Sequence, residues 1–304
     1  MNPQLAFSNL TRASRGLIAL ALAAAALPSY GLIVTPTGDA SLLANSLLGA
    51  GVTLVGTPTL TGGNLDNSNS SAAIFSGGLS TGIGIDDGIL LTSGYANLVT
   101  SSNDSSGHTG SFGGLGDAQL TDLAGVATND ATVLSFDFTT TTGDLFFQFA
   151  FASEEYNEYA NSSFADTFGF FVDGINIAVL PGTSIPISIN TVNGGNPLGT
   201  DPKNPGYFHN NDDGHLNFSY DGFTDVFTVS ALGLSAGTHT IKLAIADGSD
   251  FNLDSGVFIK AGSFVTEPPP VGVPDTSSSM LLLGLGIATL ASLRRFVARF
   301  VAAA

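Results

Sequence analysis

The chain has 304 residues, no cysteine and a formal net charge of −17 at pH 7. So negative a surface repels nucleic-acid phosphates and disfavours nucleic-acid binding, whereas it offers many oxygen ligands to hard cations such as calcium. The lack of cysteine excludes a cysteine nucleophile, an iron–sulfur cluster and a thiolate zinc site.

The N-terminal segment has the features of a secretory signal peptide. Arg12 and Arg15 precede an apolar run over residues 16–27, and no acidic residue occurs before Asp39. The three alanines at 24–26 suit the small-residue cleavage site of such a peptide. We therefore expect residues 1–26 to be a signal peptide cleaved after Ala26, with an uncleaved anchor helix as the alternative.

The next part of the chain predicts short elements joined by glycine-rich loops. Asp39 and Gly49 are placed to begin and end a helix over residues 39–49. A strand is expected over 51–60, a polar loop over 62–71, and a hairpin or strand–turn–strand over 83–91 around Asp87-Gly88. A Gly/Ser/Asn loop over 101–116 and one helical turn over 118–123 follow.

From residue 132 onward the apolar runs alternate with a period of two, which is typical of strands. Phe147, Phe149 and Phe151 share one face of a strand over 145–152, and Ile241, Leu243 and Ile245 share one face of another over 239–246. Asp173-Gly174 predicts a two-residue turn between strands 168–172 and 175–179. The other strands are expected over 132–138, 185–192, 224–232 and 257–265.

This spacing predicts a mainly β fold, with residues 27–265 forming one antiparallel β-sandwich that is jelly-roll-like and carries a short N-terminal helix. These residues and the spacer up to 272 hold 24 of the 25 acidic residues but only three lysines, a balance of 24 − 3 = 21 negative charges. An exported domain without disulfides must rely on its core, on a bound metal or on both.

Two acidic clusters each follow a predicted strand directly. One holds Glu154 and Glu155, and the other holds Asp247, Asp250 and Asp254. If the strand ends meet, these five carboxylates lie close together at one end of the sandwich, and calcium, which takes six to eight oxygen ligands, would offset their repulsion. The alternative is that they are solvated loop carboxylates in Asx turns.

Other chemistries have weaker support in the sequence. Glu155 and Asp254 could serve as the acid and base of a glycoside hydrolase, but no tryptophan is present to stack a sugar. His209 and His215 flank a turn-rich loop and lack a third zinc ligand at recognisable spacing. Four residues could hydrogen-bond or stack against a sugar, with turns and sheet-edge packing as the alternative: Asn190, Asn193, Tyr207 and Tyr220.

The C-terminal end is built as a sorting and anchoring tail. A proline-rich spacer over 266–272 precedes Val273, Pro274 and Asp275, then a small-polar stretch, the uncharged residues 280–293, and Arg294 with Arg295. The 14 uncharged residues are fewer than the ~20 that span a bilayer, so a core helix is the alternative, but the flanking arginines favour the membrane.

This tail over 273–304 resembles the PEP-CTERM class of bacterial sorting signals, in its Val-Pro-Asp-Ser-Gly variant. It departs from the variant in carrying Thr276-Ser277 and in extending nine residues beyond Arg295. The resemblance implies a precursor held transiently in the inner membrane by its C-terminal helix and processed by an exosortase-type enzyme.

Long motifs in the middle of the chain resemble the choice-of-anchor L domain. They include IGIDDGILLTSG, FASEEYNEYANSSFADTFGFFVDG and HTIKLAIADGSDFNLDSGVFIKAGSF, and the resemblance covers about residues 39–265. It implies a secreted or surface protein and supplies no catalytic residues.

The sequence thus predicts an exported, non-enzymatic protein of the cell surface, outer membrane or extracellular matrix, with an adhesive or structural role and a calcium site. The alternative is a carbohydrate-binding or glycan-hydrolysing surface protein, with extracellular polysaccharide as its partner.

Overall fold

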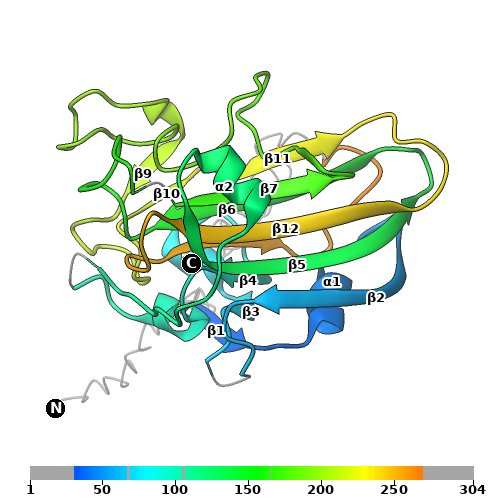
Figure 1. The fold of residues 1–304 in the computed structure, drawn as a ribbon, viewed down its shortest axis with the longest axis horizontal. Coiled ribbons are helices and arrows are strands. Elements are labelled where there is room, and N and C mark those ends of the chain that lie inside the picture. Colours follow the sequence, from blue (N-terminus) through cyan, green and yellow to red (C-terminus); the bar gives the residue numbers. More distant parts are fainter. Residues whose placement is uncertain (1–30, 67–68, 105–106, 165, 270–304) are drawn as a thin grey trace, which may run out of the picture.

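The structure, a computed structural model, describes residues 31–66, 69–104, 107–164 and 166–269. Within these residues two antiparallel sheets face each other as a sandwich, which confirms the predicted fold class (Figure 1). The signal peptide and the C-terminal helix expected from the sequence lie outside the described residues.

Each sheet mixes strands from distant parts of the chain. Over the described ranges the first sheet has eight strands, in the order β1 (Ile33–Pro36), β3 (Ala72–Ser76), β4 (Gly88–Thr92), β13 (Ser255–Lys260), β6 (Leu145–Ser153), β10 (Gly222–Thr224) and β9 (Phe208–Asn210), with β11 (Phe227–Ala231) also paired to β6. The second has five, in the order β2 (Val52–Gly62), β5 (Thr128–Thr140), β12 (His239–Gly248), β7 (Thr167–Val172) and β8 (Ile175–Asn176).

Both predicted helices form, and each begins at an aspartate. Asp39 accepts hydrogen bonds from the backbone N–H groups of Ser41 and Leu42, which starts α1 (Ala40–Leu47) as expected. The helix ends at Leu48 rather than Gly49. Asp117 caps α2 (Ala118–Ala124) in the same way. Three short 3₁₀ turns complete the helical content of the described residues: η1 (Gly78–Thr81), η2 (Ala96–Thr100) and η3 (Pro205–Tyr207).

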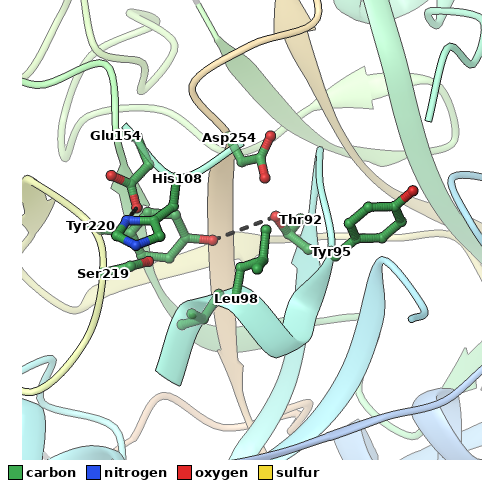
Figure 2. A pocket seen from close by; sticks show the side chains of 9 residues that line it. Thr92, Tyr95, Leu98, His108, Glu154, Ser219, Tyr220 and Asp254 are labelled. Carbon is green, nitrogen blue, oxygen red and sulfur yellow. Dashed lines mark hydrogen bonds and ion pairs between the residues drawn. The ribbon is translucent and has the colours of Figure 1, made fainter. Parts of the chain in front are cut away.

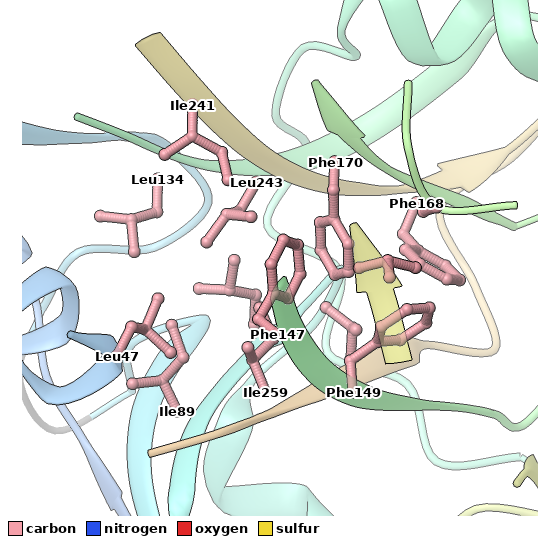
Figure 3. Packing of buried hydrophobic residues seen from close by; sticks show 14 of the residues in the cluster. Leu47, Ile89, Leu134, Phe147, Phe149, Phe168, Phe170, Ile241, Leu243 and Ile259 are labelled. Carbon is pink, nitrogen blue, oxygen red and sulfur yellow. The ribbon is translucent and has the colours of Figure 1, made fainter. Parts of the chain in front are cut away.

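The core between the sheets is rich in phenylalanine (Figure 3). Phe147 and Phe149 of β6 meet Phe170 of β7, with ring centroids 5.2 and 4.9 Å apart. The period-two pattern predicted that six side chains on the strands over 145–152 and 239–246 face the core, and this is confirmed. All six are fully buried: Phe147, Phe149, Phe151, Ile241, Leu243 and Ile245.

The outer face of the eight-stranded sheet is also covered, and this corrects the hairpin expected over 83–91. Only β4 forms there; Ile83 and Ile85 are buried in an irregular segment that packs against this outer face. Gly82 and Gly84 both have φ of +81°, a left-handed conformation that interrupts strand pairing. The isoleucines of this segment are buried, but the backbone before β4 does not form a strand.

Four further strand predictions were too long or unbroken. Residues 185–192 bury Ile187 and Ile189 but form only isolated bridges, since Pro186 lacks a backbone donor and the chain turns at 188–192. The strand expected over 224–232 is divided into β10 and β11. Those expected over 175–179 and 257–265 end at Asn176 and Lys260.

Candidate metal centre

The two acidic clusters meet at the end of the sandwich where β6 and β12 end and β13 begins. The register of β6 with β13 pairs Ser153 with Ser255. One residue further along, the backbone N–H of Glu154 donates to the carbonyl of Asp254 at 3.1 Å. The fold therefore joins two segments that are about a hundred positions apart in the sequence.

The carboxylates at this end are withdrawn from solvent. Glu154 and Glu155 are each 1% exposed, Asp247 is 0% and Asp254 is 4%, whereas Asp250 is half-buried. Buried carboxylates are rare unless they are paired or coordinate a metal, because their ionised form loses its hydration.

Asp166 lies among them, although it is not one of the five carboxylates of the predicted site. Its Oδ1 accepts from the backbone N–H of Gly248 at 2.9 Å, and its Oδ2 accepts from the Ser255 hydroxyl at 2.7 Å. Burial raises the pKa of Asp166 well above its usual range, these two hydrogen bonds lower it in part, and the charges of Asp254 and Asp250 raise it further. Asp166 is thus a fixed carboxylate that links the ends of β12 and β13.

Asp247 and Glu155 flank Asp166. Burial, followed by the negative charges of Asp166 and Asp254, raises the pKa of Asp247 well above its usual range. Ser93 approaches Asp247 and lowers this pKa in part, but neither carboxylate oxygen has a hydrogen bond of normal geometry within the described structure. Burial raises the pKa of Glu155 to about 10, with Asp166, Asp250 and Glu158 adding to the effect.

Glu154 faces a different side of the same end, toward His108 and Ser219 (Figure 2). Burial raises its pKa to about 9; the Ser219 hydroxyl opposes this, and the charge of Asp221 adds to it. Neither oxygen of Glu154 has a hydrogen bond of normal geometry among the described residues, and His108 Nδ1 lies 4.0 Å from Oε1. Burial also raises the pKa of Asp254, which lines this pocket too, to about 7.

No lysine of the described structure offsets this charge; among the described histidines, His108 approaches Glu154 at 4.0 Å. Lys242 bonds Asp117 at 2.6 Å, Lys203 bonds Asp201 at 2.9 Å and Lys260 bonds Gln148 at 3.0 Å. The five arginines of the sequence all lie outside the described ranges. Without a cation, burial therefore favours the protonated forms of Glu154, Glu155, Asp166 and Asp247 at neutral pH.

The present side-chain positions do not form a finished metal cage. Across the described part of the chain, no three His, Cys, Asp or Glu side chains are arranged to hold one metal ion. Any bound cation would need the carboxylates to rotate toward it, or would draw ligands from backbone carbonyls and hydroxyls as well.

The histidines considered for zinc do not converge. His209 pairs with Asp225 at 2.6 Å, and His215 pairs with Asp213. His239 pairs with Asp173 at 2.6 Å.

The sequence of this domain matches one family closely enough to classify it. Residues 34–265 match the model of the choice-of-anchor L domain. The chain belongs to the choice-of-anchor L family. No curated protein and no solved structure matches it.

Membership in the choice-of-anchor L family indicates a cell-surface or exported protein and fits a protein that is not an enzyme. Among the described residues of this choice-of-anchor L protein, no helix is long and apolar enough to cross a membrane. The residues of the predicted sorting signal, Val273, Pro274, Asp275, Arg294 and Arg295, lie outside the described residues.

Three residues of the acidic end were missing from the predicted site. Asp166 follows the Glu154–Glu155 segment in the sequence and could have been added from its position. Asp130 and Asp221 come from other segments, and only the fold places Asp130 near Asp247 and Asp221 near Glu154.

Proposed function

We propose that this protein is an exported, non-enzymatic component of the bacterial cell surface, outer membrane or extracellular matrix. Its acidic end binds calcium, and the bound ion holds the sandwich in its folded form. The observation that carries the calcium proposal is the set of buried carboxylates at the junction of β6, β12 and β13, which has no lysine or arginine partner among the described residues.

The electrostatics favour a cation over an array of protons. Burial of Glu155, Asp166 and Asp247 raises the pKa of all three, so the cation-free protein must take up protons to fold at neutral pH. A divalent cation would stabilise the ionised forms and reverse the sign of their mutual interaction. Binding to the folded state alone would then stabilise it by mass action.

The donor chemistry favours calcium among common cations. The side chains around Asp166 and Asp247 are carboxylates and serine hydroxyls, all of them hard oxygen donors. Calcium accepts six to eight such ligands in flexible geometry, whereas magnesium demands a near-ideal octahedron and keeps several waters. A flexible coordination shell suits side chains that must rotate to meet the ion. We assign Glu155, Asp166, Asp247, Asp250 and Asp254 to this site, with Glu154 at its margin.

A glycoside hydrolase centre fits this arrangement less well. Glu155 and Asp254 would need a sugar between them, yet they are 1% and 4% exposed. The pocket beside Glu154 and Asp254 has a cavity volume of about 0 Å³, which leaves no room for a water molecule, still less a pyranose ring.

The export part of the proposal rests on family membership and on the two terminal segments. A signal peptide over residues 1–26 would direct secretion, and the tail over 273–304 would hold a transient inner-membrane precursor for an exosortase-type enzyme. The mature domain would then act at the surface in an adhesive or structural role.

A calcium titration of the cation-free protein tests the metal site. We expect calcium to raise the melting temperature, by an amount that corresponds to about 3 kcal/mol when its free concentration is 100 times the Kd. Magnesium at the same concentration should have a smaller effect. If neither ion changes the melting temperature between pH 6 and pH 8, the carboxylates carry protons instead and the calcium assignment is wrong.

A further inference from the structure

A second feature, separate from the acidic carboxylates, is a cavity of about 160 Å³ beside α2 and β7. Leu123, Ala124 and Pro186 supply its apolar lining. Four neutral polar residues supply the rest: Thr167, Ser188, Asn190 and Thr191. All of these except Thr167 are partly exposed, so the cavity is reached from the surface.

The size of the cavity suits one six-membered ring. A protein cavity of about 150 Å³ accommodates benzene. The present cavity is of that size, but more than half of its lining residues carry a hydroxyl or an amide. A purely apolar ligand would leave those groups without hydrogen bonds, so the better occupant is a ring that bears hydroxyl groups of its own.

One lining group is a buried acceptor that lacks a hydrogen bond. Asn190 Nδ2 donates to the carbonyl of Ser162 at 2.7 Å, which fixes the amide plane. Its Oδ1 is buried and has no hydrogen-bond partner in the described structure. A hydroxyl donor in the cavity would satisfy this oxygen after a small movement of the lining side chains that exposes it.

The other polar groups of the loop are already ordered by the protein. Thr191 Oγ1 donates to the carbonyl of Pro186 at 2.7 Å and accepts from the backbone N–H of Ser188 at 2.9 Å. The Ser188 hydroxyl lies 3.3 Å from Thr191 Oγ1. Because these bonds hold the segment over 186–191 in place, a ligand would meet a largely formed site, which limits the entropy lost on binding.

We propose that this cavity binds one neutral hexopyranose unit, as a free sugar or as the terminal residue of a polysaccharide. Asn190 accepts a hydrogen bond from a ring hydroxyl, Ser188 bonds a second hydroxyl, and the C–H face of the ring packs on Leu123 and Pro186. Of the four residues that the sequence suggested for sugar contact, only Asn190 lines this cavity; Asn193 and Tyr220 are buried.

The site selects against charged sugars. None of its lining residues is basic, so a uronate or a sugar phosphate would lose its hydration without an ionic partner. The acidic balance of the surrounding domain adds repulsion at longer range.

Saturation-transfer NMR on the full chain, in calcium-containing buffer, tests the proposal. The probes are the methyl glycosides of glucose, galactose, mannose and N-acetylglucosamine, with glucuronate as the charged comparison. We expect millimolar binding of at least one neutral glycoside and none of glucuronate. Asn190→Ala should weaken that binding about fivefold to tenfold, through loss of one hydrogen bond and its tether.

A cavity-filling variant separates a binding defect from a folding defect. Ala124→Phe should fill the space, abolish glycoside binding and leave the melting temperature unchanged or higher. Ser184→Ala is the matched control, because Ser184 is exposed in the same loop and does not line the cavity. Absence of binding of all four glycosides by the unchanged protein, or binding that survives Ala124→Phe, would overturn the proposal. Binding to a polysaccharide but to none of its monosaccharides would place recognition elsewhere on the surface and would overturn it too.

Discussion

The substitution Glu155→Gln should have opposite effects on stability with and without calcium. Burial raises the pKa of Glu155 from 4.5 to about 10, so at pH 7 the cation-free folded protein keeps this side chain protonated while the unfolded chain releases the proton. Folding at pH 7 therefore requires this group to be protonated about 2.5 pH units above its unfolded pKa of 4.5. At 1.36 kcal/mol per pH unit, this lowers the free energy of unfolding by about 3 kcal/mol.

Glutamine removes the ionisation cost and keeps the shape of the side chain. Its amide has a desolvation cost of its own, since Glu155 Oε2 already lacks a hydrogen-bond partner within the described residues. The net gain for the cation-free protein should therefore be about 1–2 kcal/mol. For a domain of this size, that corresponds to a rise of roughly 2–8 °C in melting temperature.

In saturating calcium the order should reverse. The unchanged protein then uses the Glu155 carboxylate as a ligand, whereas glutamine offers only a neutral oxygen and binds the ion less tightly. Differential scanning fluorimetry in chelator and in calcium measures both effects. Glu267→Gln is the control, because Glu267 is exposed and outside the acidic end, and it should change neither melting temperature measurably.

The reasoning would be refuted if Glu155→Gln lowered the melting temperature by the same amount in chelator and in calcium. That result would mean that the carboxylate contributes through packing or a specific hydrogen bond, and not as a charge awaiting a cation.

Three further outcomes are expected. In chelator, the melting temperature should fall as the pH rises from about 5 to 9. The reason is that the buried carboxyl groups, with pKa values of about 9 for Glu154 and about 10 for Glu155, bind more protons in the folded than in the unfolded state. Calcium should flatten this profile, and a melting temperature that rises with pH in chelator would contradict the assignment. Phe149→Ala should lower the free energy of unfolding, measured by urea denaturation, by about 3–5 kcal/mol because the ring is fully buried between the sheets. A loss below about 1 kcal/mol would show that the core repacks around the cavity. Intact-mass analysis of the protein from its native host should give a species without residues 1–26 and without the residues after the Val273-Pro274-Asp275 box; retention of Arg294 and Arg295 would exclude exosortase-type processing but not membrane anchoring.

Some of this structure could be predicted from local pattern alone. A period of two places Phe147, Phe149 and Phe151 on one face whatever lies opposite, and in the fold all three are buried. Asp39 caps a helix because its side chain reaches N–H groups two and three positions away. Such features depend on neighbours in sequence, so the sequence is sufficient to find them.

The same local pattern does not distinguish a β-strand from a buried segment that is not paired in a sheet. Residues 83–91 and 185–192 alternate as strands do, and all of their isoleucines except Ile185 are buried. Whether such a segment pairs along a sheet edge or crosses a sheet face depends on distant strands. Glycines in left-handed conformations and Pro186 then interrupt the hydrogen-bond pattern between strands.

The acidic end shows most clearly what each level contributes. In the sequence, Glu154 and Glu155, and likewise Asp247, Asp250 and Asp254, come directly after predicted strands in a chain with few basic residues. Their meeting depends on the fold: β13 returns beside β6, Asp166 lies near Glu155 and Asp247, and all of these carboxylates except Asp250 are buried. The physical reason is that charge is a property of the residue, whereas desolvation is a property of its surroundings, and those surroundings are assembled from segments far apart in the chain.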